Sequence, residues 1–201
     1  MNAYWAGLAT SLGLIVAIGA QNAFVIRQGL ARNRVGLIVL VCAISDSLLI
    51  AAGVGGLGAI VTALPWLMIV LRWGGVAYLT WFGINTARSV LKNETLKSDG
   101  SPVLFTARQA LTTVLMLTYL NPHVYLDTVI FLGSIGNQFG ALRWWFVAGA
   151  ATASWIWFTG IGYGAKAASK LLAKPIFWKI LDTVIALMMF TLAGILAFAK
   201  L

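Results

Sequence analysis

Residues 35–58 read VGLIVLVCAISDSLLIAAGVGGLG, and these 24 residues include a single charged side chain, Asp46. A helix of about 20 apolar residues is long enough to cross the hydrocarbon core of a bilayer. No water is present there to hydrogen-bond the backbone, so such a segment must be helical. This stretch therefore predicts a transmembrane helix in an integral membrane protein.

Five further apolar runs of similar length accompany this one. Together they predict six spans, at residues 4–26, 35–58, 64–87, 109–133, 143–165 and 177–198. The composition agrees, because 61% of the 201 residues are hydrophobic and 9% are charged, whereas about 25% of residues in soluble domains are charged. The first run follows no basic residue and is too long for a signal-peptide core, so we expect it to be kept as a span. The predicted fold class is all-α integral membrane.

The basic residues are distributed unevenly between these runs. Eleven of the 14 lie in the gaps after the first, third and fifth spans: Arg27, Arg32, Arg34, Arg88, Lys92, Lys97, Arg108, Lys166, Lys170, Lys174 and Lys179. Arg143 and Lys200 lie in the alternate gaps, and Arg72 lies inside the third run. Since Lys and Arg concentrate in cytoplasmic loops, we expect a multi-pass protein with both termini outside the cytoplasm. The same pattern accounts for the net charge of +9 without nucleic acid as a partner.

Short similarities relate the two halves of the chain. Gln21-Asn22 corresponds to Asn121-Pro122, and the glycine-rich residues 53–56 correspond to residues 160–163. Three spans per half is an odd number, so the halves would be inverted repeats, as in many secondary transporters. We expect a single domain over residues 1–201, with repeat one at 1–92, a short cytoplasmic loop at 93–107 and repeat two at 108–201.

Two carboxylates lie within predicted spans, where an ionisable group costs several kcal/mol unless it is paired or faces water. Asp46 lies in the second span, and Asp127 lies in the fourth, about 8 Å beyond the Asn121-Pro122 pair. The functional interpretation is that both acids face a central cavity. The alternative is that each only ties helices together, Asp46 by pairing with Arg72. The rarity of membrane acids without a role favours the first interpretation.

The fourth span contains the sequence LNPHVYLD at residues 120–127. Pro122 lacks an N–H and crowds the carbonyl of Thr118, which predicts a break in the helix at this point. The Thr118 carbonyl is then free to bind a substrate ammonium, together with the Asn121 amide. A simple proline kink is the alternative. His123 and Asp127 are four residues apart and share a helix face, so they are candidates for a proton relay. A structural hydrogen bond from His123 is equally compatible with the sequence.

The first span carries two uncharged amides, Gln21 and Asn22, and Gln28 lies seven residues after Gln21 on the same face. Amides can hold the charged groups of an amino acid without adding net charge, and an interhelical amide clamp is the alternative.

Several remaining residues have simpler interpretations. Gly160 and Gly164 have the spacing of a helix-dimer motif, which leaves a homodimer open, although we expect packing within the chain. Asp182, at the start of the sixth span, is interpreted as a helix-end charge. A single cysteine, Cys42, and a single histidine predict no disulfide, metal site or cofactor.

These motifs resemble the lysine/arginine exporter family (LysE superfamily, LysE and ArgO branch) over nearly the whole chain. The matching stretches are GAQNAFVIRQG at 19–29, ISD at 44–46, RWGGVAYL at 72–79 and LNPHVYLD at 120–127. The resemblance implies export of lysine or arginine across the bacterial inner membrane, driven by the proton motive force. Two features depart from the family pattern. The loop from Lys92 to Arg108 is shorter than in some members, and Asp182 matches no family motif.

The resemblance and the acids together suggest a mechanism in which Asp46 and Asp127 bind either the cationic amino acid or protons. Polar groups nearby would hold the α-amino and α-carboxylate groups: Gln21, Asn22, Asn121 and Tyr125. The expected partners are a basic amino acid, protons and the lipid bilayer. Export of neutral amino acids or other small metabolites is the nearest alternative. Alternatives of another class are a passive channel and a membrane-embedded enzyme, and the lack of a nucleophile or metal motif weighs against the enzyme.

Overall fold

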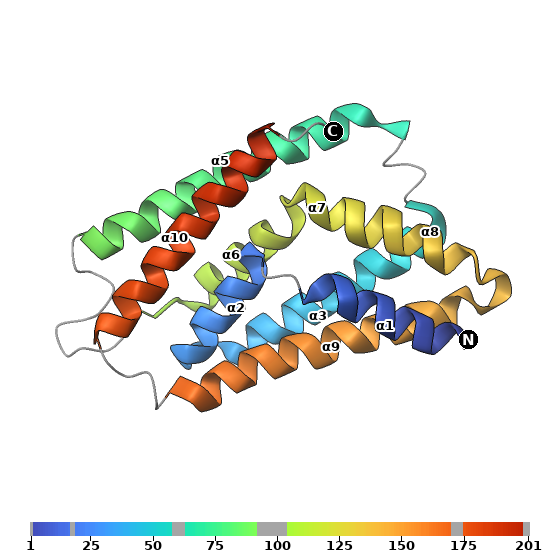
Figure 1. Ribbon diagram of the computed structural model, residues 1–201, viewed down its shortest axis with the longest axis horizontal. Helices are drawn as coiled ribbons and strands as arrows, with labels where there is room; N and C mark the ends of the chain where they lie inside the picture. Colours follow the sequence, from blue (N-terminus) through green and yellow to red (C-terminus); the bar gives the residue numbers. More distant parts are fainter. Residues whose placement is uncertain (1, 17–18, 58–62, 92–103, 170–174, 199–201) are drawn as a thin grey trace.

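The computed structural model describes residues 2–16, 19–57, 63–91, 104–169 and 175–198, and this part of the chain is helical with no strand (Figure 1). The all-α prediction is therefore confirmed. In chain order the elements are α1 (Ala3–Ile15), α2 (Ala20–Leu30), α3 (Val35–Ala52), the wide turn η1 (Gly53–Leu57), α5 (Pro65–Leu91), α6 (Ala107–Tyr119), α7 (Pro122–Val124), the π-helical η2 (Tyr125–Phe131), α8 (Leu132–Asn137), the 3₁₀ turn η3 (Gly140–Leu142), α9 (Arg143–Ala168) and α10 (Pro175–Phe198).

Three helical stretches are long and apolar enough to cross a membrane, at residues 35–57, 66–91 and 176–198. They match the predicted second, third and sixth spans. The predicted first span is divided into α1 and α2, which bend by 81° and count as one further candidate. The predicted fourth span is divided at Pro122, and the predicted fifth span coincides with α9, which extends for about 39 Å at 1.5 Å per residue. Multiple membrane helices are confirmed, whereas the total of six stays a prediction.

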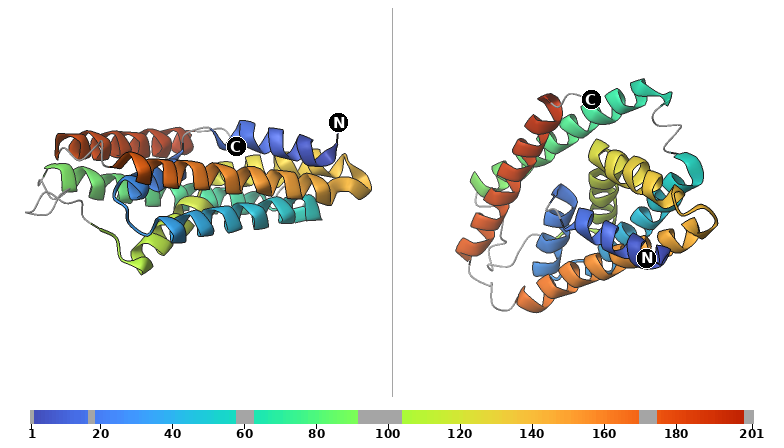
Figure 2. Two further views of the ribbon diagram at one scale, coloured as in Figure 1. Left: turned by 90° about the horizontal axis from the view of Figure 1, so that it is seen from below. Right: turned by 45° about the vertical axis from the view of Figure 1, so that its right-hand side comes forward.

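The helices form two groups. In one group α9 packs against α1, α2 and α3, while α5 and α10 pack against each other as a separate pair (Figures 1 and 2). A single apolar core nevertheless joins both groups, because it contains buried side chains from each: Phe24, Ile38, Cys42, Leu79, Phe82, Val114, Phe158, Ile185 and Met189. The α5/α10 pair therefore lies against the rest of the molecule through apolar contacts.

Glycine allows helices to approach closely at several places, of which two illustrate the point. A Cβ added at Gly149 of α9 would overlap the backbone of Tyr4 in α1, and one added at Gly133 of α8 would lie 2.8 Å from the backbone of Gly53. A side chain at either glycine would push the two backbones apart, so these close contacts require glycine.

The expected internal packing of Gly160 and Gly164 is wrong. A Cβ added at either position would meet nothing within 4 Å, whereas one at Gly162 would lie 2.7 Å from Val39. Successive residues turn by about 100° around a helix, so Gly162 faces roughly away from the other two glycines. Only Gly162 faces the core.

The charged ends of the helices gather at one end of the molecule, at the left of Figure 1. The C-terminal ends of α2, α5 and α9 and the N-terminal ends of α3 and α10 lie there. They carry Arg27, Arg32, Arg34, Arg88 and Lys166, and we call this the basic end. The side of the membrane that the basic end faces stays a prediction. Most of the expected loop at 93–107 lies outside the described residues.

Candidate substrate site

The first of two helix breaks lies between α1 and α2. Gly19 precedes α2 in an extended conformation and has no side chain to cap the helix. Asn22, in the first turn of α2, donates from its side-chain amide to the Ile15 carbonyl at 2.9 Å, and its oxygen accepts from the Trp157 indole N–H at 3.4 Å. Asn22 thus ties both halves of the broken helix to α9.

The second break lies between α6 and α7, where the sequence predicts it. Pro122 is the first residue of α7, a position whose N–H has no helical partner in any case. The Asn121 side-chain oxygen accepts from the His123 backbone N–H at 3.1 Å and so caps the new helix. Thr118 is fully buried, and its hydroxyl donates to the Val114 carbonyl at 2.8 Å. The proline therefore starts a helix instead of bending a continuous one.

A cavity of about 120 Å³ lies between the two breaks. Its polar lining is formed by Ser11, Gln21, Asn22, Asp46, Asn121, His123, Asp127 and Thr128. The structure thus brings together five of the six residues expected to contact the substrate, and both members of the expected proton relay. Tyr125 is not among the lining residues, because its hydroxyl donates to the Tyr119 carbonyl at 3.0 Å. We call this space the acidic chamber.

The two acids of the chamber come from separate elements, Asp46 from the middle of α3 and Asp127 from η2. The Ser154 hydroxyl of α9, which is fully buried, donates to Asp46 at 3.1 Å. The alternative pairing of Asp46 with Arg72 is wrong, because Arg72 donates instead to the Ala197 carbonyl at the end of α10. Among the described residues that line the chamber there is no lysine or arginine, so its two carboxyl groups have no permanently cationic side chain beside them.

Ser154 escapes prediction from the sequence because one serine in an apolar run gives no local signal. For Gln28 the sequence suggests a site residue that the structure places elsewhere. It shares a helix face with Gln21, yet it does not line the chamber and is fully buried, and within the described part of the chain its side-chain amide has no hydrogen-bond partner.

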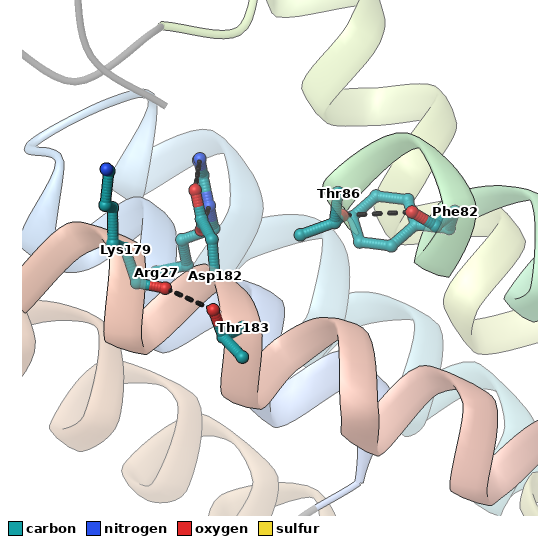
Figure 3. A network of polar contacts seen from close by, with 6 residues as sticks. All are labelled: Arg27, Phe82, Thr86, Lys179, Asp182 and Thr183. Carbon is teal, nitrogen blue, oxygen red and sulfur yellow. Dashed lines mark hydrogen bonds and ion pairs between the residues drawn. The ribbon is translucent and has the colours of Figure 1, made fainter. Parts of the chain in front are cut away.

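The interpretation of Asp182 as a helix-end charge is wrong. Asp182 is fully buried, and its carboxylate accepts from Arg27 of α2 at two atoms, Nε at 2.6 Å and Nη2 at 3.0 Å (Figure 3). It lies in the second turn of α10, on the side that faces α2 and not the end of the helix. The ion pair joins the α5/α10 pair to the other group of helices.

This ion pair lines a larger cavity at the basic end, with a volume of about 590 Å³. Its other walls are formed by aromatic side chains and by polar groups from α5 and α6: Tyr78, Trp81, Phe82, Phe105, Asn85, Thr86, Ser89, Arg108, Gln109, Thr112 and Thr113. We call this cavity the vestibule. Figure 3 shows Phe82 and Thr86 of α5 near the ion pair.

A third cavity, of about 370 Å³, lies between the vestibule and the acidic chamber. It shares Tyr78 and Met116 with the vestibule. With the acidic chamber it shares Asn121, His123 and Asp127. The three cavities therefore adjoin one another in sequence from the basic end to the two helix breaks.

Comparison with known proteins gives a consistent result. The family model described as LysE type translocator matches residues 12–200. The chain is 43% identical to "Putative amino-acid transporter Rv0488" of Mycobacterium tuberculosis, over 90% of this chain and 89% of the relative. It is 35% identical to "Lysine exporter LysE" of Corynebacterium glutamicum, over 96% and 97% of the two chains. It is 38% identical to "Arginine exporter protein ArgO" of Klebsiella pneumoniae, over 96% and 92%.

No solved structure matches the chain at a significant level. The family match covers most of the sequence, and the apolar helices and polar cavities described above are those of a membrane transporter. The expected family is therefore confirmed: the chain belongs to the LysE type translocators, a family of membrane amino-acid transporters that includes exporters of lysine and of arginine.

Proposed function

We propose that this protein exports basic L-amino acids, lysine or arginine, from the bacterial cytoplasm across the inner membrane in exchange for protons. One observation carries the proposal. Asp46 and Asp127, from separate elements, line a single chamber to which no lysine or arginine contributes. A positively charged solute is the natural counter-ion for such a chamber. The printed names of two relatives, a lysine exporter and an arginine exporter, agree with it.

The amino-acid end of the substrate would be held at the helix breaks. The N-terminus of α2 has no side-chain cap, so N–H groups of its first turn would be able to bind an anion such as the α-carboxylate. Gln21 and Asn121 add side-chain amides to the same chamber. Broken helices whose N-termini face the carboxylate of an amino acid occur in other secondary transporters.

Proton exchange follows from the charge on the substrate. Moving a monocation outwards against an inside-negative potential costs about 2.3 kcal/mol per 100 mV. Inward movement of one proton cancels that charge transfer, so the proton gradient drives export. A carboxylate that holds either a proton or the substrate cation couples the two movements. His123, which also lines the chamber, would pass the proton to or from Asp127.

Alternating access would come from two inverted repeats of three spans each, with both termini outside the cytoplasm. Each repeat would begin with a broken helix, α1/α2 in the first and α6/α7 in the second. The third helix of each repeat would be α5 or α10, which pack together. Rocking of the repeats about the chamber would open it to one side at a time.

The test is efflux of labelled lysine, arginine and neutral amino acids from cells that overexpress the chain. We expect efflux of the basic amino acids only, with its loss in Asp46→Asn and Asp127→Asn. Asp99→Asn is the matched control, because Asp99 lies outside the predicted spans. Efflux of arginine and lysine at the wild-type rate in both chamber variants would refute the proposal.

A second measurement separates the alternatives. In proteoliposomes with a pH-sensitive dye inside, export of a basic amino acid should move protons in the opposite direction. Transport without proton movement would indicate a passive channel, and transport of neutral amino acids alone would indicate the other exporter class.

A further inference from the structure

The Arg27–Asp182 pair has an unusual arrangement for a structural ion pair. Two nitrogens of the guanidinium, Nε and Nη2, donate to the carboxylate, but the third, Nη1, is buried and has no hydrogen-bond partner among the described residues. Buried polar groups in folded proteins are nearly always paired, and an unpaired one calls for an explanation. The Asp182 site therefore holds its cation along one edge only and leaves the rest of the guanidinium unsatisfied.

Aromatic rings line the vestibule together with the ion pair, and one further basic side chain, Arg108, lies in the same lining. The rings of Tyr78, Trp81 and Phe82 line the same cavity as Asp182, and aromatic faces attract ammonium and guanidinium groups. The Phe105 ring lies 5.9 Å from the Arg27 guanidinium carbon. Arg27 would keep this cation–π contact if its bonds to Asp182 were broken.

The ion pair also lies where a substrate entering from the basic end would first contact an acid. Asp182 faces a cavity of about 590 Å³ formed by residues at the end of α5 and the start of α6, at the basic end that the charge distribution predicts to be cytoplasmic. The middle cavity shares Tyr78 and Met116 with this cavity, and it shares Asp127 with the acidic chamber. A solute travelling along these cavities meets Asp182 before it meets the two chamber acids.

We propose that Asp182 is a third cation site, at which the cationic side chain of a basic amino acid first docks by taking the place of Arg27. This inference deepens the proposed function and rests on it. Arg27 occupies the site when no substrate is present, because a buried carboxylate without a counter-ion is strongly unfavourable. Only another cation can release Arg27 without leaving Asp182 unpaired, so the exchange selects positively charged substrates before they reach the chamber.

The experiment measures the apparent KM for labelled arginine separately at each face. Inside-out membrane vesicles present the cytoplasmic face to the label, and right-side-out vesicles present the outer face. In Arg27→Gln the competing cation is gone, and the substrate cation becomes the counter-ion that the buried Asp182 carboxylate lacks, so KM at the cytoplasmic face should fall several-fold. In the double variant Arg27→Gln with Asp182→Asn, neither charge remains, and that KM should rise tenfold or more. KM at the outer face should stay within twofold of wild type in both.

Arg72→Gln is the matched control, because Arg72 is another membrane-depth arginine that donates to α10 but lines none of the three cavities. Its ratio of cytoplasmic to outer KM should equal that of wild type. Size-exclusion chromatography establishes that each variant is folded.

Three results would overturn the inference. The first is a cytoplasmic KM that is unchanged in the double variant. The second is a rise in KM in Arg27→Gln, as a purely structural pair would produce. The third is loss of folding in both variants, which would show that Asp182 cannot part from Arg27. Failure of the proposed function is distinct, because the wild-type protein itself would then transport no arginine or lysine.

Discussion

Gly149→Ala tests the packing that holds α1 on α9. The new Cβ would overlap the Tyr4 carbonyl oxygen, and it would lie 2.8 Å from the carbonyl carbon of Tyr4 and 3.0 Å from the Leu8 nitrogen. All three atoms belong to the backbone of α1, so no rotamer change can relieve the overlap and the two helices must separate. Overpacking of this kind costs about 1–3 kcal/mol, and a clash between backbones belongs near the upper value.

The substitution also stabilises α9 itself, because alanine is favoured over glycine in a helix by about 0.5–1 kcal/mol. The expected net loss in the free energy of unfolding is therefore about 2 kcal/mol. For a chain of 150–250 residues this corresponds to a melting temperature lower by about 4–8 °C. The measurement is tryptophan fluorescence of the purified protein in detergent during heating.

Gly160→Ala provides the matched control on the same helix. A Cβ at Gly160 would meet nothing within 4 Å, so only the gain in helix propensity remains and the melting temperature should rise slightly. If Gly149→Ala melted at or above the temperature of Gly160→Ala, the close contact of α1 and α9 described here would be refuted.

Three other substitutions test separate contacts. Ser154→Ala removes the hydroxyl that donates to Asp46. We expect arginine efflux to slow several-fold at an unchanged melting temperature. Unaltered efflux would contradict a role for this hydrogen bond. Thr106→Ala removes the capping box with Gln109 and should lower the free energy of unfolding by about 1 kcal/mol, measured as in the glycine experiment; no change would show that the cap is not needed. Asn22→Ala removes one bond across the first helix break, to the Ile15 carbonyl, and one bond to Trp157 of α9. It should cost about 1–3 kcal/mol in the same assay, whereas wild-type stability would mean that the break is held by other contacts.

Local signals account for the part of the fold that sequence predicts well. The apolar runs give the positions of α3, α5, α9 and α10 to within a few residues, because hydrophobic length is read directly from the chain. The break at Pro122 is likewise local, since it follows from the missing N–H and the bulk of the ring. The division of the first span between α1 and α2 has no proline to announce it, and the glycine that marks it resembles many others.

The acidic chamber is predictable for a related reason. Charged and amide side chains are rare within membrane spans, so Asp46, Asp127, Gln21, Asn22 and Asn121 stand out individually, and the structure places all five around one cavity. Their roles stay predictions. The placement of Tyr125 differs from expectation because its hydroxyl turns back to the Tyr119 carbonyl within the same broken helix.

The Arg27–Asp182 pair could not be predicted in this way. Its members are 155 residues apart, and each has a more common local explanation, a loop cation for Arg27 and a helix-end charge for Asp182. Counting basic residues by gap assigns Arg27 to a loop, although it lies inside α2. Only the packing of α10 against α2 identifies the two as partners.

The position of α5 and α10 as a separate pair has a consequence for how the molecule meets lipid. The outer faces of these helices carry exposed apolar side chains: Trp66, Ile69, Val70, Trp73, Ile176, Ile180, Val184 and Leu187. Acyl chains solvate such groups as well as protein does, so movement of either helix in the proposed rocking of the repeats would expose little that the bilayer disfavours. In water the same movement would be opposed by the hydrophobic effect. The membrane thus lowers the free-energy cost of this movement. Changes in acyl-chain order should therefore alter the turnover rate more than the affinity for substrate.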